Sequence, residues 1–287
     1  MSARLRELAQ RTEEIVATGA YVTGDGRTIH LAGAVARARQ GTRLYGPEPV
    51  AVPPAPAVAA PWPSPEVTGE SSLGAARRMT GERAEPVAVL NFASARNPGG
   101  GHLAGAQAQE EALCRSSALY TCLLAVPEFY AHHRADRDVF YSDRVIHSPG
   151  VPVFRDDSGR LLDEPYEAGF LTCPAPNAGV IARRTPERVD RIPVALARRA
   201  ERVLEVAARH GYRRLVLGAW GCGVFRNDPE QVARVFAQLL DPMAGRFHGR
   251  FEQVVFAVLD RTKGAATRSA FERVLTGAAG PAAQRQP

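Results

Sequence analysis

The sequence has few of the features that mark secreted, membrane or metal-binding proteins. Its 287 residues include only 4 cysteines, none of them in a C-x-x-C pair, which argues against a zinc site or a disulfide framework. No stretch approaches the roughly 18 uncharged apolar residues of a transmembrane helix, and the N-terminus lacks the apolar core of a signal peptide. These absences predict a cytoplasmic protein with reduced thiols, no membrane association and no metal.

Lysine is nearly absent: Lys263 is the only one, and arginine carries the remaining positive charge. The formal net charge of +6 favours an acidic partner, such as a nucleic acid or another phosphate-rich polymer. Charge alone does not choose between them. With 45% hydrophobic and 23% charged residues, the composition is ordinary for a globular protein with a core of good size.

The most informative stretch covers residues 91–111. It follows an apolar run at residues 87–90 that predicts an interior strand, and it contains three consecutive glycines, which let the backbone adopt positive φ and approach a ligand closely. The helix expected from Gln107 places Glu110 and Glu111 in its first turns. Free N–H groups at such a helix start suit a phosphate or pyrophosphate.

Two adjacent carboxylates beside an anion site need a separate purpose, because negative charge near a bound anion costs energy. Neighbours on a helix point about 100° apart, so we do not expect Glu110 and Glu111 to flank one bond as paired glycosidase carboxylates do. One of them can act on a scissile bond while the other grips hydroxyl groups. The alternative interpretation of adjacent glutamates is a solvated helix face.

A second glycine-containing loop, residues 218–225, also follows a predicted buried strand. Strands that alternate with helices predict an α/β fold, and ligands of such folds bind at the carboxyl ends of the strands. We therefore expect the two loops to face one another across one crevice. The alternative is that both loops are only tight turns at strand ends.

A Pro- and Ala-rich segment at residues 47–65 divides the chain and predicts a stiff connector. We expect an N-terminal accessory segment over residues 1–65, with a helix, a hairpin and this connector. The main catalytic domain is expected over residues 66–277. The last residues, 278–287, are small, polar and Pro-containing, and we expect them to be disordered.

The apolar pattern predicts the position of most helices and strands. Helices are expected over residues 4–18, 33–40, 72–79, 107–124, 193–209, 229–240 and 267–275. A hairpin is expected over residues 21–31, and strands at residues 67–68, 87–90, 139–141, 145–147, 151–154, 168–173, 214–217 and 253–259. The acidic turn at residues 156–159 lacks the rest of a calcium loop, so no metal is expected there.

Three glycines, seven further residues and then Gln-Glu-Glu resemble the signature of the poly(ADP-ribose) glycohydrolases. Residues 90–94 and Pro98 resemble the bacterial branch, and the likeness extends from about residue 66 to about residue 276. The resemblance implies a macrodomain fold, with a mixed sheet flanked by helices, that binds ADP-ribose. It also implies hydrolysis of the ribose–ribose O-glycosidic bond of poly(ADP-ribose), mainly at chain ends and without a cofactor.

The resemblance implies that Glu111 is the catalytic acid and that Glu110 holds the ribose hydroxyls. A protonated carboxyl would donate to the departing ribose 2′-oxygen as an oxocarbenium ion forms, and the carboxylate would then take a proton from water. The residues expected to bind the substrate or to fix its loops are Gly99, Gly100, Gly101, Gln109, Asn97, Gly221, Cys222, Gly223, Val224 and Phe225.

Some positions near the two loops leave alternatives open. Ser94 stands where related macrodomains often place a ribose-binding Asn. His102 has no recognisable nucleophile beside it in the sequence, which favours a bystander role over a catalytic one. An aromatic residue is expected at the adenine, and Phe92, Tyr120 and Phe256 are not separated by the sequence.

Two rival functions also remain. The chain could be an ADP-ribose reader without turnover, although the intact pair Glu110 and Glu111 argues against this. It could instead hydrolyse O-acetyl-ADP-ribose or mono-ADP-ribosylated side chains. In the leading interpretation the partners are poly(ADP-ribose), ADP-ribose and ADP-ribosylated proteins, and the protein is expected to be a monomer.

Overall fold

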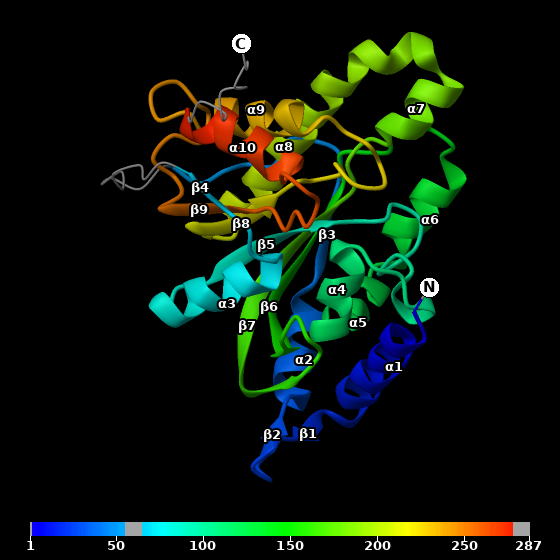
Figure 1. Cartoon of the computed structure of the whole chain (residues 1–287), viewed down its shortest axis with the longest axis vertical. Helices are drawn as coiled ribbons and strands as arrows, with labels where there is room; N and C mark the ends of the chain where they lie inside the picture. The colour runs from blue at the N-terminus through cyan, green and yellow to red at the C-terminus, as the bar shows by residue number, and fades with distance from the viewer. Residues whose placement is uncertain (1, 55–64, 278–287) are drawn as a thin grey trace, which may run out of the picture.

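The computed structural model describes residues 2–54 and 65–277, which form one large mixed sheet with helices on both faces (Figure 1). The strands of this sheet are β3 (Arg43–Tyr45), β4 (Glu66–Thr68), β5 (Val87–Phe92), β6 (Val145–Arg155), β7 (Leu161–Cys173), β8 (Arg214–Gly218) and β9 (Gln253–Ala257). A separate antiparallel pair consists of β1 (Ala20–Val22) and β2 (Thr28–His30).

The helices account for most of the remaining described chain. They are α1 (Ala3–Thr18), α2 (Ala32–Gly41), α3 (Ser72–Glu82), α4 (Gln109–Ser116), α5 (Leu119–Leu124), α6 (Pro127–Ala135), α7 (Ala178–Arg184), α8 (Ile192–Arg209), α9 (Pro229–Leu240) and α10 (Ala266–Thr276). Two short 3-10 helices are η1 (His102–Ala104) and η2 (Pro186–Arg191).

The strand order of the main sheet is β3-β6-β7-β5-β8-β9-β4. The strands from β7 to β4 are parallel to their neighbours, whereas β6 and β3 pair in antiparallel fashion. The expected α/β fold with a mixed, macrodomain-like sheet is confirmed. Since β5 and β8 are parallel neighbours, with Val87 opposite Arg214, the loops that follow them leave the same edge of the sheet.

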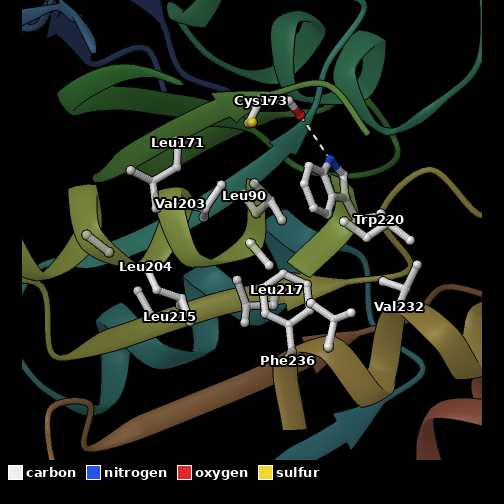
Figure 2. Close-up of a cluster of buried hydrophobic side chains, with 14 of the residues drawn as sticks. Leu90, Leu171, Cys173, Val203, Leu204, Leu215, Leu217, Trp220, Val232 and Phe236 are labelled. Carbon is white, nitrogen blue, oxygen red and sulfur yellow. Dashed lines mark hydrogen bonds between the residues drawn. The ribbon is translucent and has the colours of Figure 1, made fainter. Parts of the chain in front are cut away.

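Alternate residues of β5 enter two apolar cores, one on each face of the sheet. Val87 and Val89 lie in the core that α3, α4 and α5 cover. Ala88 and Leu90 lie in the core beneath α8 and α9, which Figure 2 shows. A strand buried on both faces has an unbroken apolar sequence, which explains why the short run at residues 87–90 predicted an interior strand.

The N-terminal segment contributes to the main sheet. β3 is its edge strand and pairs with β6, and the apolar residues of α2 lie in the same core as those of α5. Residues 55–64 of the expected connector and the expected disordered tail, residues 278–287, lie outside the described residues. The division of the chain near residue 65 stays a prediction.

Several local elements form where the sequence predicts them. α1 ends at Gly19, which is left-handed with φ 71° and whose N–H donates to Ile15 O at 2.8 Å. Ser71 caps α3, because its hydroxyl accepts from the Gly74 N–H at 2.9 Å. Asp228 caps α9 in the same way, through the Glu230 N–H.

The single helix predicted over residues 107–124 is wrong. The chain instead forms α4 and α5, with Ser117 extended between them at φ −146° and ψ 175°. Ser117 forms an isolated antiparallel bridge with Val153, and the Ala118 N–H donates to Pro152 O at 3.1 Å. Contact with β6 therefore interrupts a pattern that is helical in local terms.

The strand predicted at residues 139–141 is also wrong, because these residues form a turn. Tyr141 has a positive φ of 61°, and its N–H donates to Asp138 O at 3.3 Å. The two strands expected at residues 145–147 and 151–154 are one strand, β6, with an irregular register between Ser148 and Val151.

Two further findings concern the described part of the chain as a whole. None of its helices is long and apolar enough to cross a membrane. Within the same residues, His, Cys, Asp and Glu side chains form no group of three or more that could hold a metal ion, and all four cysteines are free.

Candidate active site

The loop after β5 folds tightly against α4 and α5. Gly99 and Gly100 have φ values of 66° and 59°, a left-handed conformation that favours glycine. A side chain at Gly99 would come within 2.9 Å of the Tyr120 ring. The first two glycines are therefore required both for the backbone conformation and for the close approach of the loop to the helices.

Glu111 lies in the first turn of α4 and bonds to the glycine loop. Its Oε1 accepts from the Gly101 N–H at 2.9 Å, and its Oε2 accepts from the Ala108 N–H at 3.0 Å. The side chain is buried, with 8% of its surface exposed. Two backbone donors fix the direction of this carboxyl group against the loop.

Glu110 is more deeply buried, with 3% of its surface exposed. Its Oε2 accepts from the Ser94 N–H at 2.7 Å, and its Oε1 accepts from Asn91 Nδ2 at 3.3 Å. Burial raises the pKa of Glu110 to about 8, although the bonds from Ser94 and Asn91 act in the opposite direction. Glu110 is therefore largely protonated at neutral pH.

The two carboxyl groups meet at a single point of the first loop. A side chain added at Gly100 would overlap Glu111 Oε1 and would lie 3.2 Å from Glu110 Oε2. Adjacent residues on α4 thus direct both carboxyls to the same glycine. The solvated helix face considered for this pair is wrong, since both side chains are buried.

Gln109 joins the end of β5 to the start of α4. Its Oε1 accepts from the Phe92 N–H at 2.9 Å, and its Nε2 donates to Leu90 O at 2.8 Å and to Ser72 Oγ at 3.1 Å. Both ends of this amide are occupied by the protein, so its geometry is that of a residue that fixes the loop.

Two other side chains of the first loop lie apart from the carboxyl groups. Asn97 is exposed, and its N–H donates to Ser94 Oγ at 3.2 Å. His102 is 1% exposed, and its Nε2 lies 3.0 Å from Glu13 Oε1 on α1. The histidine is therefore held by the N-terminal helix.

The second loop is fixed from beneath by Trp220 and Asn227. Trp220 Nε1 donates to Cys173 O at the end of β7, at 2.9 Å (Figure 2). Asn227 Nδ2 donates to Pro176 O and to Gly221 O at 2.9 and 3.2 Å. Gly221 is left-handed, and a side chain there would lie 2.5 Å from Asn227 Nδ2.

The tip of the second loop faces solvent. Gly223 is exposed and a side chain added there would contact nothing within 4 Å, while Val224 is 82% exposed. Among the described residues, the backbone N–H groups of Gly223, Val224 and Phe225 donate to no protein acceptor. Burial raises the pKa of the neighbouring Cys222 to about 12, so this thiol stays protonated.

Tyr141 connects the two loops. Its ring centroid lies 6.0 Å from that of Phe225, and the guanidinium carbon of Arg96 in the first loop lies 6.0 Å from the same Tyr141 ring. Buried Arg199 holds this region in place by donating to Phe140 O at 2.7 Å and to Pro174 O at 2.8 Å. Tyr141 therefore lies close to one residue of each glycine loop.

Sequence reasoning missed four residues of this site: Asn91, Tyr141, Arg199 and Asn227. Only Asn91 carried a signal, as a polar residue directly after an apolar run. The structure also sets one of the three aromatic candidates apart, because Phe256 is fully buried between Phe236 and Phe271. Phe92 and Tyr120 are each partly exposed.

Comparison with known families and structures gives consistent results. Residues 9–156 match the model of the catalytic domain of microbial-type PARG, the poly(ADP-ribose) glycohydrolases. Among curated proteins, none matches the chain.

Solved structures resemble the whole fold. The poly(ADP-ribose) glycohydrolase from Thermomonospora curvata is 51% identical over 95% of this chain and 100% of its own, with a TM-score of 0.89. That enzyme bound to the inhibitor ADP-HPD is 52% identical over 95% and 99% of the two chains, with a TM-score of 0.86. The glycohydrolase from Deinococcus radiodurans in complex with ADP-ribose is 46% identical over 87% and 99%, with a TM-score of 0.77. This chain therefore belongs to the family of microbial-type poly(ADP-ribose) glycohydrolases.

Proposed function

We propose that this poly(ADP-ribose) glycohydrolase releases ADP-ribose mainly from the ends of the polymer, with Glu111 as general acid and base. The observation that carries the proposal is the meeting of two buried carboxyl groups at Gly100, on a loop that adjoins a second glycine loop. A binding module without turnover has no need of a buried acid pair at this point.

The solved relatives support ADP-ribose as the occupant of the two loops. The enzyme from Deinococcus radiodurans was solved with ADP-ribose, and that from Thermomonospora curvata with the inhibitor ADP-HPD. In this chain the free N–H groups of Gly223, Val224 and Phe225 form a row of donors in an exposed loop. Successive free backbone N–H groups are suited to a diphosphate.

The two glutamates have different tasks in the proposed reaction. Glu111 donates a proton to the leaving ribose 2′-oxygen as the oxocarbenium ion forms, and its carboxylate then takes a proton from the attacking water. Glu110 bonds the ribose hydroxyls. Because burial keeps Glu110 largely neutral at pH 7, it can hold the sugar without placing a second negative charge beside the diphosphate.

The remaining residues bind the substrate or fix its loops. Gly99, Gly100 and Gly101 border the distal ribose, and Phe225 covers its face. Gly221 and Cys222 shape the second loop around the diphosphate, Asn97 reaches the adjacent polymer unit, and Gln109 fixes the first loop. The bonds of Gln109 to Phe92 and Leu90 support that last role.

Cleavage at chain ends is proposed from the position of α1. Its N-cap Ser2 donates through N–H to Gly105 O at 3.1 Å, and Glu13 meets His102. The N-terminal accessory segment thus lies directly against the first loop, where it can limit the room for a further polymer unit. We also propose that the protein acts as a cytoplasmic monomer on ADP-ribosylated proteins, with a catalytic domain over residues 66–277.

The replacement Glu111→Gln tests the role of the acid. We expect kcat on poly(ADP-ribose) to fall by at least about 100-fold, because removal of general acid–base catalysis costs 10²–10⁴. The affinity for ADP-ribose, measured by calorimetry, should stay within about tenfold. Glu14→Gln on the exposed face of α1 is the matched control and should keep full activity. A variant at position 111 that turns over normally would refute the assignment.

Product analysis separates the remaining alternatives. The wild-type enzyme should release mainly ADP-ribose from purified polymer at the earliest times, while the remaining chains shorten slowly. Early release of long oligomers would exclude the chain-end mode. Activity on O-acetyl-ADP-ribose or mono-modified protein, with none on the polymer, would exclude the proposed function in favour of the rival hydrolase.

A further inference from the structure

Five exposed arginines lie on segments that adjoin the two glycine loops. They are Arg134 of α6, Arg137 in the turn that follows it, Arg183 and Arg184 of α7, and Arg226 directly after the second loop. We call these five residues the arginine surface. Within residues 2–54 and 65–277, none of them has an Asp or Glu oxygen within 4.0 Å, so their charges face solvent.

Hydrogen bonds tie the arginine surface to the site. Arg134 Nη1 donates to Arg96 O in the first loop at 2.8 Å. The Gly179 N–H of α7 donates to Phe225 O in the second loop at 2.9 Å, and a side chain at Gly179 would lie 3.1 Å from Arg226 Cδ. Figure 1 shows α6 and α7 on the same side of the molecule.

The segment with Arg134 and Arg137 also contacts the segment with Arg183 and Arg184. Arg188 of η2, which follows α7, bonds to Asp138 Oδ2 at 2.9 Å, directly beside Arg137. The Asn177 N–H before α7 donates to Val139 O at 3.1 Å. The segment that carries Arg137 and the segment that leads into α7 are therefore in direct contact, although they are distant in sequence.

No described carboxylate forms an ion pair with this surface. Residues 91–109, 174–186 and 218–227 contain no Asp or Glu. Asp138 and Asp143 are already paired with arginines outside the arginine surface, at positions 188 and 198–199. The exposed carboxylates that remain on or next to these segments are Glu128, Asp136, Glu187, Asp190 and Asp228, and none of them lies within 4.0 Å of a side-chain nitrogen of the arginine surface.

We propose that the arginine surface binds phosphate groups of the polymer beyond the unit held in the active site, a role that rests on the proposed function. If the terminal ADP-ribose occupies the two loops, the rest of the chain must leave the site over neighbouring segments. α6 precedes β6 and α7 follows β7, so both flank one side of β5. Each polymer unit carries a diphosphate, and the arginine guanidinium matches phosphate in bidentate fashion.

The double replacement of Arg183 and Arg184 by Gln tests this role, because neither side chain bonds to another described residue. The matched control replaces Arg39 of α2 and Arg77 of α3 by Gln, two exposed arginines that form no ion pair with a described residue, on helices far from α7 (Figure 1). Each variant is assayed on long polymer and on ADP-ribose with a small leaving group on its distal ribose, which occupies only the active site.

We expect the double variant of Arg183 and Arg184 to raise KM on long polymer about five- to tenfold at low salt, with kcat within twofold. The small substrate should be cleaved at the wild-type rate. Loss of two phosphate contacts should also flatten the dependence of log KM on log salt by about 1.4, since each contact on a single strand contributes about 0.7. The control variant should match the wild type on both substrates.

Other outcomes would overturn the inference. An unchanged KM on long polymer would show that the arginine surface takes no part in binding, and an equal loss on both substrates would show that the arginines act on loop geometry. If single-stranded DNA of equal charge inhibits polymer cleavage as strongly as added polymer does, the arginine surface binds polyanions in general and is not specific to this polymer. Failure of the proposed function is distinct, because the wild type would then leave the polymer uncleaved, whatever its activity on the small substrate.

Discussion

At the scale of single residues, the site depends on amides and backbone N–H groups that orient two carboxyls. Gln109 matters most, because the two glutamates follow it directly and its amide bonds join three segments of the chain. A rotation of the first turn of α4 would move both carboxyl groups away from Gly100. Gln109 therefore fixes the first turn of α4, which carries both glutamates, while the carboxyls themselves are oriented by their own donors.

Replacement of Gln109 by Leu tests this dependence. It leaves the Phe92 N–H and Leu90 O without their side-chain partner, and unpaired groups of this kind cost about 1–3 kcal/mol each when buried. Since Leu90 is fully buried but Phe92 is only partly buried, we expect the free energy of unfolding in urea to fall by about 1–3 kcal/mol. We also expect kcat to fall at least tenfold. Gln107→Leu, at an exposed position two residues earlier, is the control. Unchanged kcat in the Gln109 variant would contradict the positioning role.

Some of these residues could be predicted from the sequence and others could not. The three glycines and both glutamates were identified because they are contiguous, and their expected place at the start of a helix after a strand is confirmed. Tyr141 was placed in a strand, because its conformation depends on a turn that Arg199 holds through Phe140 O, about sixty residues away in sequence. Contacts of this range leave no trace in local pattern.

At the scale of elements, the sequence again predicts what depends on neighbouring residues and misses what depends on distant contacts. α1, α3, α8 and α9 begin and end close to their predicted bounds, because caps, prolines and glycines act locally. The break between α4 and α5 was not predicted, because it follows from a contact with β6. The place of β3 at the edge of the main sheet was not predicted either, since three residues carry no reliable strand pattern.

The attachment of α1 to α4 gives a prediction at this scale. Thr12 is fully buried, and its Oγ1 donates to Arg115 O at 2.7 Å and accepts from Arg155 Nε at 3.0 Å. Thr12→Val removes both bonds and should lower the free energy of unfolding by about 1–3 kcal/mol. Thr18→Val should cost less, because the exposed Thr18 hydroxyl bonds only to carbonyl oxygens close to it in sequence, those of Glu14, Ile15 and Ala20. Equal losses in the two variants would show that α1 is not fixed through Thr12.

At the scale of the whole molecule, the loops of the proposed site leave one edge of the sheet, and the apolar cores that stabilise the fold cover both of its faces. β5 and β8 lie at the centre of the sheet and are covered on either side, so the loops that leave them start from rigid strands. This arrangement also buries a carboxyl group, that of Glu110. Its protonation couples the stability of the whole fold to pH.

The sign of this coupling follows from the raised pKa of Glu110, about 8 in the folded protein against an ordinary 4.5. Between these values the folded state holds a proton that the unfolded state has lost, so the stability contributed by neutral Glu110 is complete below about 4.5 and is lost as pH rises towards 8. The loss is at most about 1.4 kcal/mol per pH unit.

Urea unfolding of the wild type and of Glu110→Gln from pH 5 to pH 9 measures this loss, because the variant side chain cannot ionise. The contribution of histidine titration is the same in both proteins and cancels in the difference between their free energies of unfolding. We expect the wild type to lose stability relative to the variant across this range, whereas Glu14→Gln should follow the wild type. Parallel curves for the wild type and Glu110→Gln would mean that Glu110 is already ionised in the folded protein, and the proposed neutral grip on the ribose would then fail.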